Sequence, residues 1–275
     1  MRRRARSPIP PAPSPDAALF LDVDGTLLDI APMPDGVVVP EGLIEALRRL
    51  NAALGGATAL VSGRRRAELR RLFRGAGVVM VGEHGATASI ALPELQNGRG
   101  ERPPAALTAA LRRFVARHPD TLLELKGHGA ALHVRRAPSV APAAKRLAET
   151  LAETYRDRVR LLRGKAVFEF VAVGTSKGRA IEALMRQEPF RGRVPYVIGD
   201  DLTDEDAFEV ANRLGGVSLR VGSSDLRMVP SAARYTIASP SQLRKWLRGV
   251  ADALAAGKPN RRARNHAGAR AFSDT

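Results

Sequence analysis

Short apolar runs alternate with amphipathic segments over most of the 275-residue chain. The run 18–21 (Ala-Leu-Phe-Leu) predicts a buried strand, whereas residues 41–54 repeat leucine and isoleucine at the spacing of one helical stripe. On the same grounds we predict strands at 58–61, 78–81, 194–198 and 217–221, and helices at 64–73, 176–187, 203–213 and 240–254. Strands and helices that alternate in this way indicate a parallel sheet with right-handed crossovers.

The pattern changes between residues 87 and 172. Helices are predicted at 105–117 and 138–155, and each is followed by two strands, at 121–126 with 130–135 and at 158–162 with 167–172. Strands joined by such short turns must be antiparallel. We therefore predict an α/β protein with a Rossmann-like core at 17–86 and 173–255, and an inserted α+β cap of order αββαββ at 87–172.

The chain has no cysteine, which excludes disulfides, thiolate nucleophiles and cysteine zinc sites. Its net charge of +16 raises the question of whether it binds nucleic acid. The Pro/Arg-rich ends, 1–16 and 256–275, show no periodicity, are expected to be disordered, and carry +3 and +4 of the charge. The remaining excess is spread along helices, and only 4% of residues are aromatic, so the pattern favours solvated charge over nucleic-acid binding. No apolar run approaches the roughly 20 residues of a membrane helix, and proline follows the basic start, so we expect a soluble cytoplasmic protein.

Two carboxylates follow the first predicted strand, in Asp22-Val23-Asp24-Gly25-Thr26. Ligands collect at the carboxyl ends of strands in open parallel sheets. Carboxylates placed there can hold a hard cation, and one of them can attack phosphorus to form an aspartyl-phosphate. The alternative is a capped turn, because Asp and Gly are common in turns.

A second acidic group follows the predicted strand 194–198, in Gly199-Asp200-Asp201-Leu202-Thr203-Asp204. Acidic residues in the first turn of a helix also suit its dipole, which is the alternative interpretation. Two carboxylate clusters at the ends of two parallel strands would repel each other unless a metal lies between them. Because only hard oxygen ligands are available, the metal indicated is Mg²⁺.

Two further elements lie at strand-to-helix junctions. Ser62-Gly63-Arg64 follows the second strand and could hold phosphate oxygens through a hydroxyl and backbone N–H groups. Lys177 stands at the start of a helix, where its charge opposes the helix dipole, so a phosphate-binding role is better motivated than a structural one.

With these four elements in order, the chain resembles the haloacid dehalogenase (HAD) superfamily of phosphatases. Asp22-Val23-Asp24-Gly25-Thr26, Ser62, Lys177 and Gly199-Asp200-Asp201 match its four motifs. Within it, residues 18–255 resemble the trehalose-6-phosphate phosphatases. The stretches that carry this resemblance are Gly82-Glu83-His84-Gly85, Glu124-Leu125-Lys126-Gly127, His133-Val134-Arg135, 164–170 (Gly-Lys-Ala-Val-Phe-Glu-Phe) and 199–205.

The resemblance implies Mg²⁺-dependent hydrolysis of trehalose 6-phosphate. In this reading Asp22 attacks phosphorus, Asp24 is the general acid and then the base, and Ser62 and Lys177 orient the phosphoryl oxygens. The ion would be held by Asp22, Asp200 and the backbone carbonyl of Asp24. Asp201 and Asp204 would set its position.

The resemblance also assigns contacts with the substrate. These are Gly63, Arg64, Glu83 and His84 in the core, and Glu124, Lys126, His133, Arg135, Lys165 and Glu169 in the cap. Several of the cap residues share an alternating strand face, which could instead be a salt-bridged sheet surface. His133 could be a partly buried core histidine, and His84 a loop residue that orients Glu83.

Two other classes of function, one enzymatic and one not, stay open on the sequence. The same core could serve a related sugar phosphatase or a phosphohexomutase, or a non-enzymatic protein that binds a phosphosugar or nucleic acid. The expected ligand is a small sugar phosphate, with no membrane involved, and a trehalose-phosphate synthase is a candidate partner.

Overall fold

The computed structural model describes residues 10–31, 36–92, 102–164, 166–222 and 230–257. Its larger sheet has the strand order β11-β10-β9-β1-β2-β3-β4, and all pairs of neighbouring strands are parallel except β3 and β4, which are antiparallel. The strands are β1 (Ala17–Leu21), β2 (Thr58–Val61), β3 (Val79–Gly82), β4 (Thr87–Ala88), β9 (Val194–Gly199), β10 (Val217–Val221) and β11 (Tyr235–Ile237). All residues of β1, β2 and β10 are buried, as is typical of a parallel sheet that is covered on both faces.

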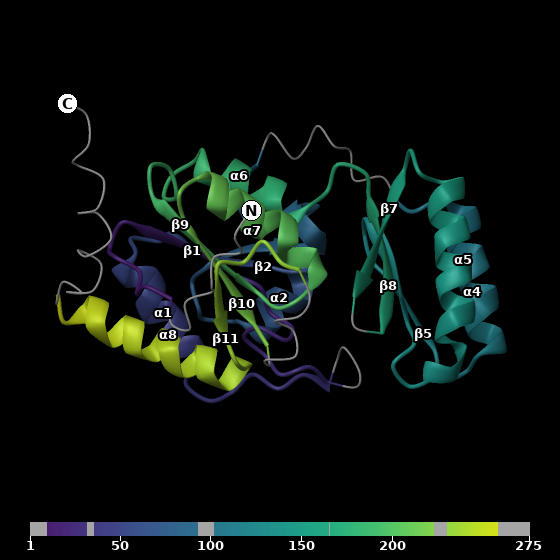
Figure 1. Cartoon of the computed structure of the whole chain (residues 1–275), viewed down its shortest axis with the longest axis horizontal. Helices are drawn as coiled ribbons and strands as arrows, with labels where there is room; N and C mark the ends of the chain where they lie inside the picture. Colours follow the sequence, from purple (N-terminus) through teal and green to yellow (C-terminus); the bar gives the residue numbers. More distant parts are fainter. Residues whose placement is uncertain (1–9, 32–35, 93–101, 165, 223–229, 258–275) are drawn as a thin grey trace, which may run out of the picture.

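Helices cover both faces of this sheet. They are α1 (Leu43–Ala53), α2 (Arg66–Leu72), α6 (Lys177–Met185), α7 (Glu205–Arg213) and α8 (Pro240–Ala255). Helices α1 and α8 pack together on one side, and α6 and α7 pack together on the other (Figure 1). Short 3₁₀ turns, η2 (Glu83–Gly85) and η4 (Leu202–Asp204), follow β3 and β9. We call this unit the core.

The second unit, called the cap below, is a four-stranded antiparallel sheet of order β5-β6-β8-β7. Its elements are α4 (Ala105–Arg117), β5 (Leu122–Leu125), β6 (Gly129–His133), η3 (Pro138–Val140), α5 (Ala141–Thr154), β7 (Val159–Gly164) and β8 (Val167–Ala172). Helices α4 and α5 cover the face of the sheet that is turned away from the core (Figure 1). The cap has an apolar cluster of its own, to which Leu111, Leu132 and Phe170 contribute. The predicted fold class is confirmed, while the domain limits stay a prediction.

Some features differ from the expectation. Strands β4 and β11 were not predicted, and β4 extends the core sheet beyond residue 86, where the first core segment was expected to end. Residues 10–16, expected to be part of a disordered tail, lie against the core, because Arg193 Nη1 donates to Pro15 O (2.9 Å) and Tyr196 Oη to Ala12 O (3.4 Å). Residues 1–9 and 258–275 lie outside the described part. No helix among the described residues is long and apolar enough to cross a membrane.

Candidate active site

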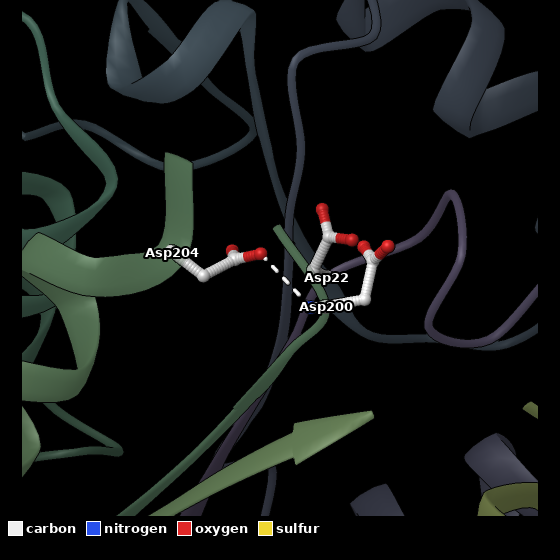
Figure 2. A group of neighbouring side chains, drawn as sticks. All are labelled: Asp22, Asp200 and Asp204. Atoms are coloured by element: carbon white, nitrogen blue, oxygen red, sulfur yellow. Dashed lines mark hydrogen bonds between the residues drawn. The ribbon is translucent and has the colours of Figure 1, made fainter. Parts of the chain in front are cut away.

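The ends of β1 and β9 bring two buried carboxylates together. These strands pair in parallel with Leu21 opposite Ile198, and the backbone N–H of Asp22 donates to Ile198 O at 2.9 Å. Asp22 and Asp200 therefore leave the same sheet edge, as the sequence predicts, and their carboxyl groups lie next to each other (Figure 2). Ligand oxygens of Asp22, Asp200 and Asp204 all lie within 4.8 Å of one another, and the three residues are buried.

Lys177 is the cation that faces these carboxylates. It is the first residue of α6, after the N-cap Ser176, and only 3% of it is exposed. Its Nζ donates to Asp22 Oδ1 and Asp204 Oδ1, both at 2.7 Å. Burial would lower the pKa of Lys177, but Asp204 and Asp22 outweigh it and raise the pKa, so this lysine is charged.

Among the residues that the structure describes, carboxylates outnumber cations around Asp22. Three carboxylates face one ammonium group, and burial together with Asp204 and Asp200 raises the pKa of Asp22 well above its ordinary value, although Lys177 lowers it. A buried set of carboxylate oxygens with excess negative charge fits a hard divalent cation. Asp22 and Asp200 are the residues that could hold one.

Asp204 and Asp201 have other bonds in this structure. Asp204 Oδ2 accepts from the backbone N–H groups of Asp200 and Asp201 at 3.1 Å, and Oδ1 accepts from Lys177. Asp201 Oδ1 accepts from the N–H of Leu202 at 2.8 Å and caps η4. Asp204 thus braces the turn that carries Asp200, as Figure 2 shows for its bond to the Asp200 backbone.

Gly25 allows Asp200 to approach the first motif. Its φ is +79°, and a Cβ at this position would lie 2.3 Å from Asp200 Oδ2. Only glycine suits both the left-handed backbone and this contact. Thr26 Oγ1 donates to Asp200 Oδ1 at 3.4 Å, a contact that was not predicted from the sequence.

The second motif follows β2. Ser62 is 1% exposed, and its Oγ accepts from the N–H of Arg64 at 3.2 Å. Arg64 Nε and Nη2 each donate to one oxygen of Asp24 at 2.7 Å, which forms a bidentate ion pair. The proposed acid–base group and the proposed phosphate loop are therefore in direct contact.

A strained corner follows β3. Glu83 and His84 are consecutive non-glycine residues with φ of 52° and 55°, in the left-handed region. This conformation costs about 1–2 kcal/mol per residue. Both residues are buried, and Glu83 does not line the cavity between core and cap, whereas His84 does.

The polar face of the cap sheet closes the other side of that cavity. Glu169 in β8 forms an ion pair with Lys126, and Glu124 Oε2 lies 3.0 Å from His133 Nε2. Burial would raise the pKa of Glu169, but His84 and Lys126 hold it well below its ordinary value. The pKa of Glu124 is also lowered, because its bond with His133 and the charge of Lys126 outweigh burial.

The structure brings most of the predicted site residues to one cavity. Those that line it are Asp22, Asp24, Ser62, Gly63, Arg64, His84, Glu124, Lys126, His133, Arg135, Glu169, Lys177, Asp200 and Asp201. Asp204 and Glu83 are buried beside it, and Lys165 lies outside the described residues. The catalytic, metal and substrate roles of these residues stay predictions.

The sequence did not indicate several residues that line the same cavity. They are Ile30, Ala31, Val37, Glu68, Leu162, Gly164, Val167 and Thr203. Most are apolar or small, and such residues carry no chemical signature in a single sequence. Gly164, Val167 and Thr203 lie within stretches that carry the family resemblance, so their positions could have indicated them.

Comparisons with known proteins agree with this arrangement. Residues 20–241 match the trehalose-phosphatase family. The chain is 38% identical to the trehalose-6-phosphate phosphatase of Escherichia coli K12 over 89% of this chain and 90% of that protein. It is also 38% identical to a probable trehalose-phosphate phosphatase of Sinorhizobium fredii, over 86% of this chain and 87% of that protein.

Solved structures support the fold. The C-terminal domain of the Candida albicans trehalose-6-phosphate phosphatase has a TM-score of 0.73 at 20% identity, over 86% of this chain and 92% of that domain. A phosphatase of the haloalkanoate (HAD) enzyme superfamily from Bacteroides thetaiotaomicron has a TM-score of 0.54 at 18% identity, over 85% of this chain and 95% of that one. These structures show that the chain shares its fold with a HAD phosphatase. The resemblance to the trehalose phosphatases is confirmed: the chain belongs to the trehalose-phosphatase family.

Proposed function

We propose that this protein is a Mg²⁺-dependent phosphatase that hydrolyses trehalose 6-phosphate to trehalose and phosphate through an aspartyl-phosphate. The observation that carries the proposal is the position of Asp22: a buried carboxylate, 2.7 Å from Lys177, in a cavity whose opposite wall is the polar face of the cap. The names of the E. coli and S. fredii relatives support trehalose phosphate as the substrate and trehalose synthesis as the role.

The first step transfers the phosphoryl group to the protein. An oxygen of Asp22 forms a bond to phosphorus while the bond from phosphorus to the sugar 6-oxygen breaks. Asp24 delivers a proton to the departing oxygen. Lys177 and Ser62 orient the phosphoryl oxygens as charge spreads over them.

The second step releases phosphate. Asp24 takes a proton from water, the water oxygen bonds to phosphorus, and the bond from phosphorus to Asp22 breaks. For both steps, Arg64 must release at least one oxygen of Asp24, because it holds both in this structure. An incoming phosphate offers this arginine an alternative anionic partner.

The predicted cofactor would be held by Asp22 and Asp200. When bound, Mg²⁺ would offset the negative charge that an anionic carboxylate meets on approaching a phosphate ester. Asp204 keeps Asp200 in place through its backbone N–H (3.1 Å).

The cap supplies the groups that can recognise a sugar. Glu124, Lys126, His133 and Glu169 offer acceptors and donors at the cavity wall, and apolar residues such as Leu162 and Val167 lie beside them. Sugars present both hydroxyl groups and apolar C–H faces, which match this mixture. Cytoplasmic location and association with a synthase stay predictions.

The test is release of inorganic phosphate from a panel of sugar phosphates, with Mg²⁺ and with EDTA. We expect the highest kcat/KM for trehalose 6-phosphate, dependence on Mg²⁺, and loss of activity by at least about 10³-fold in Asp22→Asn. Preference for a hexose monophosphate would favour a related sugar phosphatase, and isomerised sugar phosphate without free phosphate would favour a mutase. Full activity in EDTA would refute the role of the metal.

A further inference from the structure

The side chains of Glu83 and His84 reach from the core to the cap. Glu83 Oε2 accepts from the backbone N–H of His128 at 2.7 Å, in the turn between β5 and β6. His84 Nε2 lies 2.9 Å from Glu169 Oε2 in β8. Both residues and Glu169 are at most 8% exposed, so opening the cap would separate these groups and expose them to water.

The backbone of this corner is held in place by the phosphate loop. The N–H of Glu83 donates to Arg64 O at 2.9 Å, and the N–H of His84 donates to Ser62 O at 3.0 Å. Two consecutive left-handed residues persist only where their surroundings impose that conformation. Here the imposed conformation places both side chains against the cap.

The cap makes a return contact with the same loop. Lys126 forms an ion pair with Glu169, and its Nζ also donates to Gly63 O at 2.7 Å. Gly63 leaves no room for a side chain, because a Cβ there would lie 2.5 Å from His84 Nε2. His84, Glu169, Lys126 and Gly63 therefore form a closed chain of contacts from core to cap and back.

We propose that Glu83 and His84, with His128 and Glu169 opposite them, form a closure latch that holds the cap on the core before substrate arrives and fixes the Ser62–Arg64 loop. Glu83 and His84 are then positioning residues. The effect on catalysis rests on the proposed function, whereas the effect on cap closure does not.

The sequence-based interpretation of these two residues as substrate contacts predicts a different behaviour. Glu83 is only 8% exposed, and its Oε2 already accepts from the backbone N–H of His128, so this oxygen is engaged between core and cap in the ligand-free structure. A residue that only contacts the sugar changes the ligand-bound state and leaves the ligand-free arrangement of core and cap as it is. The state without ligand therefore separates the two interpretations.

The experiment measures the distance between spin labels on the cap and the core by double electron–electron resonance spectroscopy. Because the chain has no cysteine, Arg113→Cys on α4 and Arg248→Cys on α8, both exposed, give two labelling sites without other changes. The variants are Glu83→Ala and His84→Asn, since Asn tolerates the left-handed backbone. Glu83→Gln is the matched control, because its amide oxygen can still accept from the His128 N–H.

Without ligand, we expect one narrow distance distribution for the unaltered chain and for Glu83→Gln. Glu83→Ala and His84→Asn should add longer distances, and trehalose at saturating concentration should reduce them. The proposal would be overturned if both variants gave the same distance distribution as the unaltered chain. A broad distribution in the unaltered chain would also overturn it. If Glu83→Ala does not fold, His84→Asn carries the test.

Kinetics test the link to the reaction. If loss of the latch lowers the closed fraction from about 0.9 to about 0.1, the KM for trehalose 6-phosphate rises about ninefold, because only the closed state is competent. The KM of Glu83→Gln should stay within about twofold of that of the unaltered chain. An unchanged KM beside a widened distance distribution would remove the catalytic part of the proposal. Absence of phosphatase activity in the unaltered chain would refute the proposed function and leave the distance measurement valid.

Discussion

Replacement of Asp204 by asparagine tests how the acidic cluster is built. The sequence placed Asp204 near the metal, but in this structure both of its oxygens are engaged in hydrogen bonds with the protein. If Asp204 is a structural brace, Asp204→Asn destabilises the fold whether or not Mg²⁺ is present. If it is a direct ligand, the effect depends on the metal.

The magnitude follows from the individual bonds. Asparagine keeps one oxygen for the N–H groups of Asp200 and Asp201, but its amide cannot accept the charged bond from Lys177 that now measures 2.7 Å. A hydrogen bond to a charged group contributes about 1.5–3 kcal/mol. Lys177 keeps Asp22 as a partner, and removal of one carboxylate relieves repulsion on Asp22, so we expect a loss of about 2 kcal/mol.

Urea unfolding in EDTA, followed by fluorescence, measures this loss. Trp246 is the only tryptophan of the chain and packs against the apolar cluster of the core, so it reports on that unit. With a urea m-value of about 3 kcal/mol/M, the midpoint should fall by about 0.7 M. Asp201→Asn is the matched control: it removes a charge from the same turn, but asparagine caps a helix as well as aspartate does.

The outcome that contradicts this account is specific. It is an unchanged midpoint in EDTA together with a loss of stabilisation by added Mg²⁺. That result would identify Asp204 as a metal ligand and would mean that its bond with Lys177 contributes little to the fold.

Three further changes have defined outcomes. Gly25→Ala should raise the Mg²⁺ concentration needed for half-maximal activity at least tenfold, because the new Cβ would lie 2.3 Å from Asp200 Oδ2 and push that side chain away. A Mg²⁺ titration of phosphate release measures this, and an unchanged titration would contradict it. Glu169→Gln should lower the melting temperature at pH 7, and the difference from the unaltered chain should shrink below about pH 4.5. Because folding lowers the pKa of Glu169, its carboxylate stabilises the fold at any pH above its ordinary pKa of 4.5, and this stabilisation is lost as the pH falls toward the folded-state pKa. A difference that is constant from pH 7 to pH 3 would count against the ion pair with Lys126. Lys177→Met should cost about 3–5 kcal/mol in EDTA, because it removes the cation that Asp22 and Asp204 share and leaves Asp204 only its two backbone N–H bonds. A loss under about 1 kcal/mol by chemical unfolding would show that these carboxyl groups are neutral or hydrated.

The meeting of Asp22 and Asp200 could be predicted from the sequence. Each follows an apolar run that reads as a strand, and parallel strands end at the same edge of their sheet, so the strand order was not needed. The cap elements were also readable, since two amphipathic helices and four short strands form its own apolar cluster. Strands β4 and β11, of two and three residues, are too short to show a period.

The partners of individual polar groups could not be predicted. The bonds from Lys126 to Gly63 O and from Arg64 to Asp24 join residues 63 and 40 positions apart. The first depends on how the cap lies on the core, and the second depends on how the loops after β1 and β2 lie against each other. No local pattern encodes that placement. The left-handed backbone of Glu83 was equally hidden, because glycine and asparagine are the residues that signal it.

The interrupted order of the core strands has a consequence for biosynthesis. Strand β1 lies between β2 and β9, and Ala17 of β1 pairs with Val194 of β9. Strand β9 follows the cap in the sequence, so it is translated only after the entire cap. A nascent chain that has emerged as far as residue 172 exposes one open edge of β1 and lacks Lys177 and Asp200. A chain that ends anywhere in the cap therefore lacks at least two of the predicted active-site residues, and we expect it to associate through that open edge.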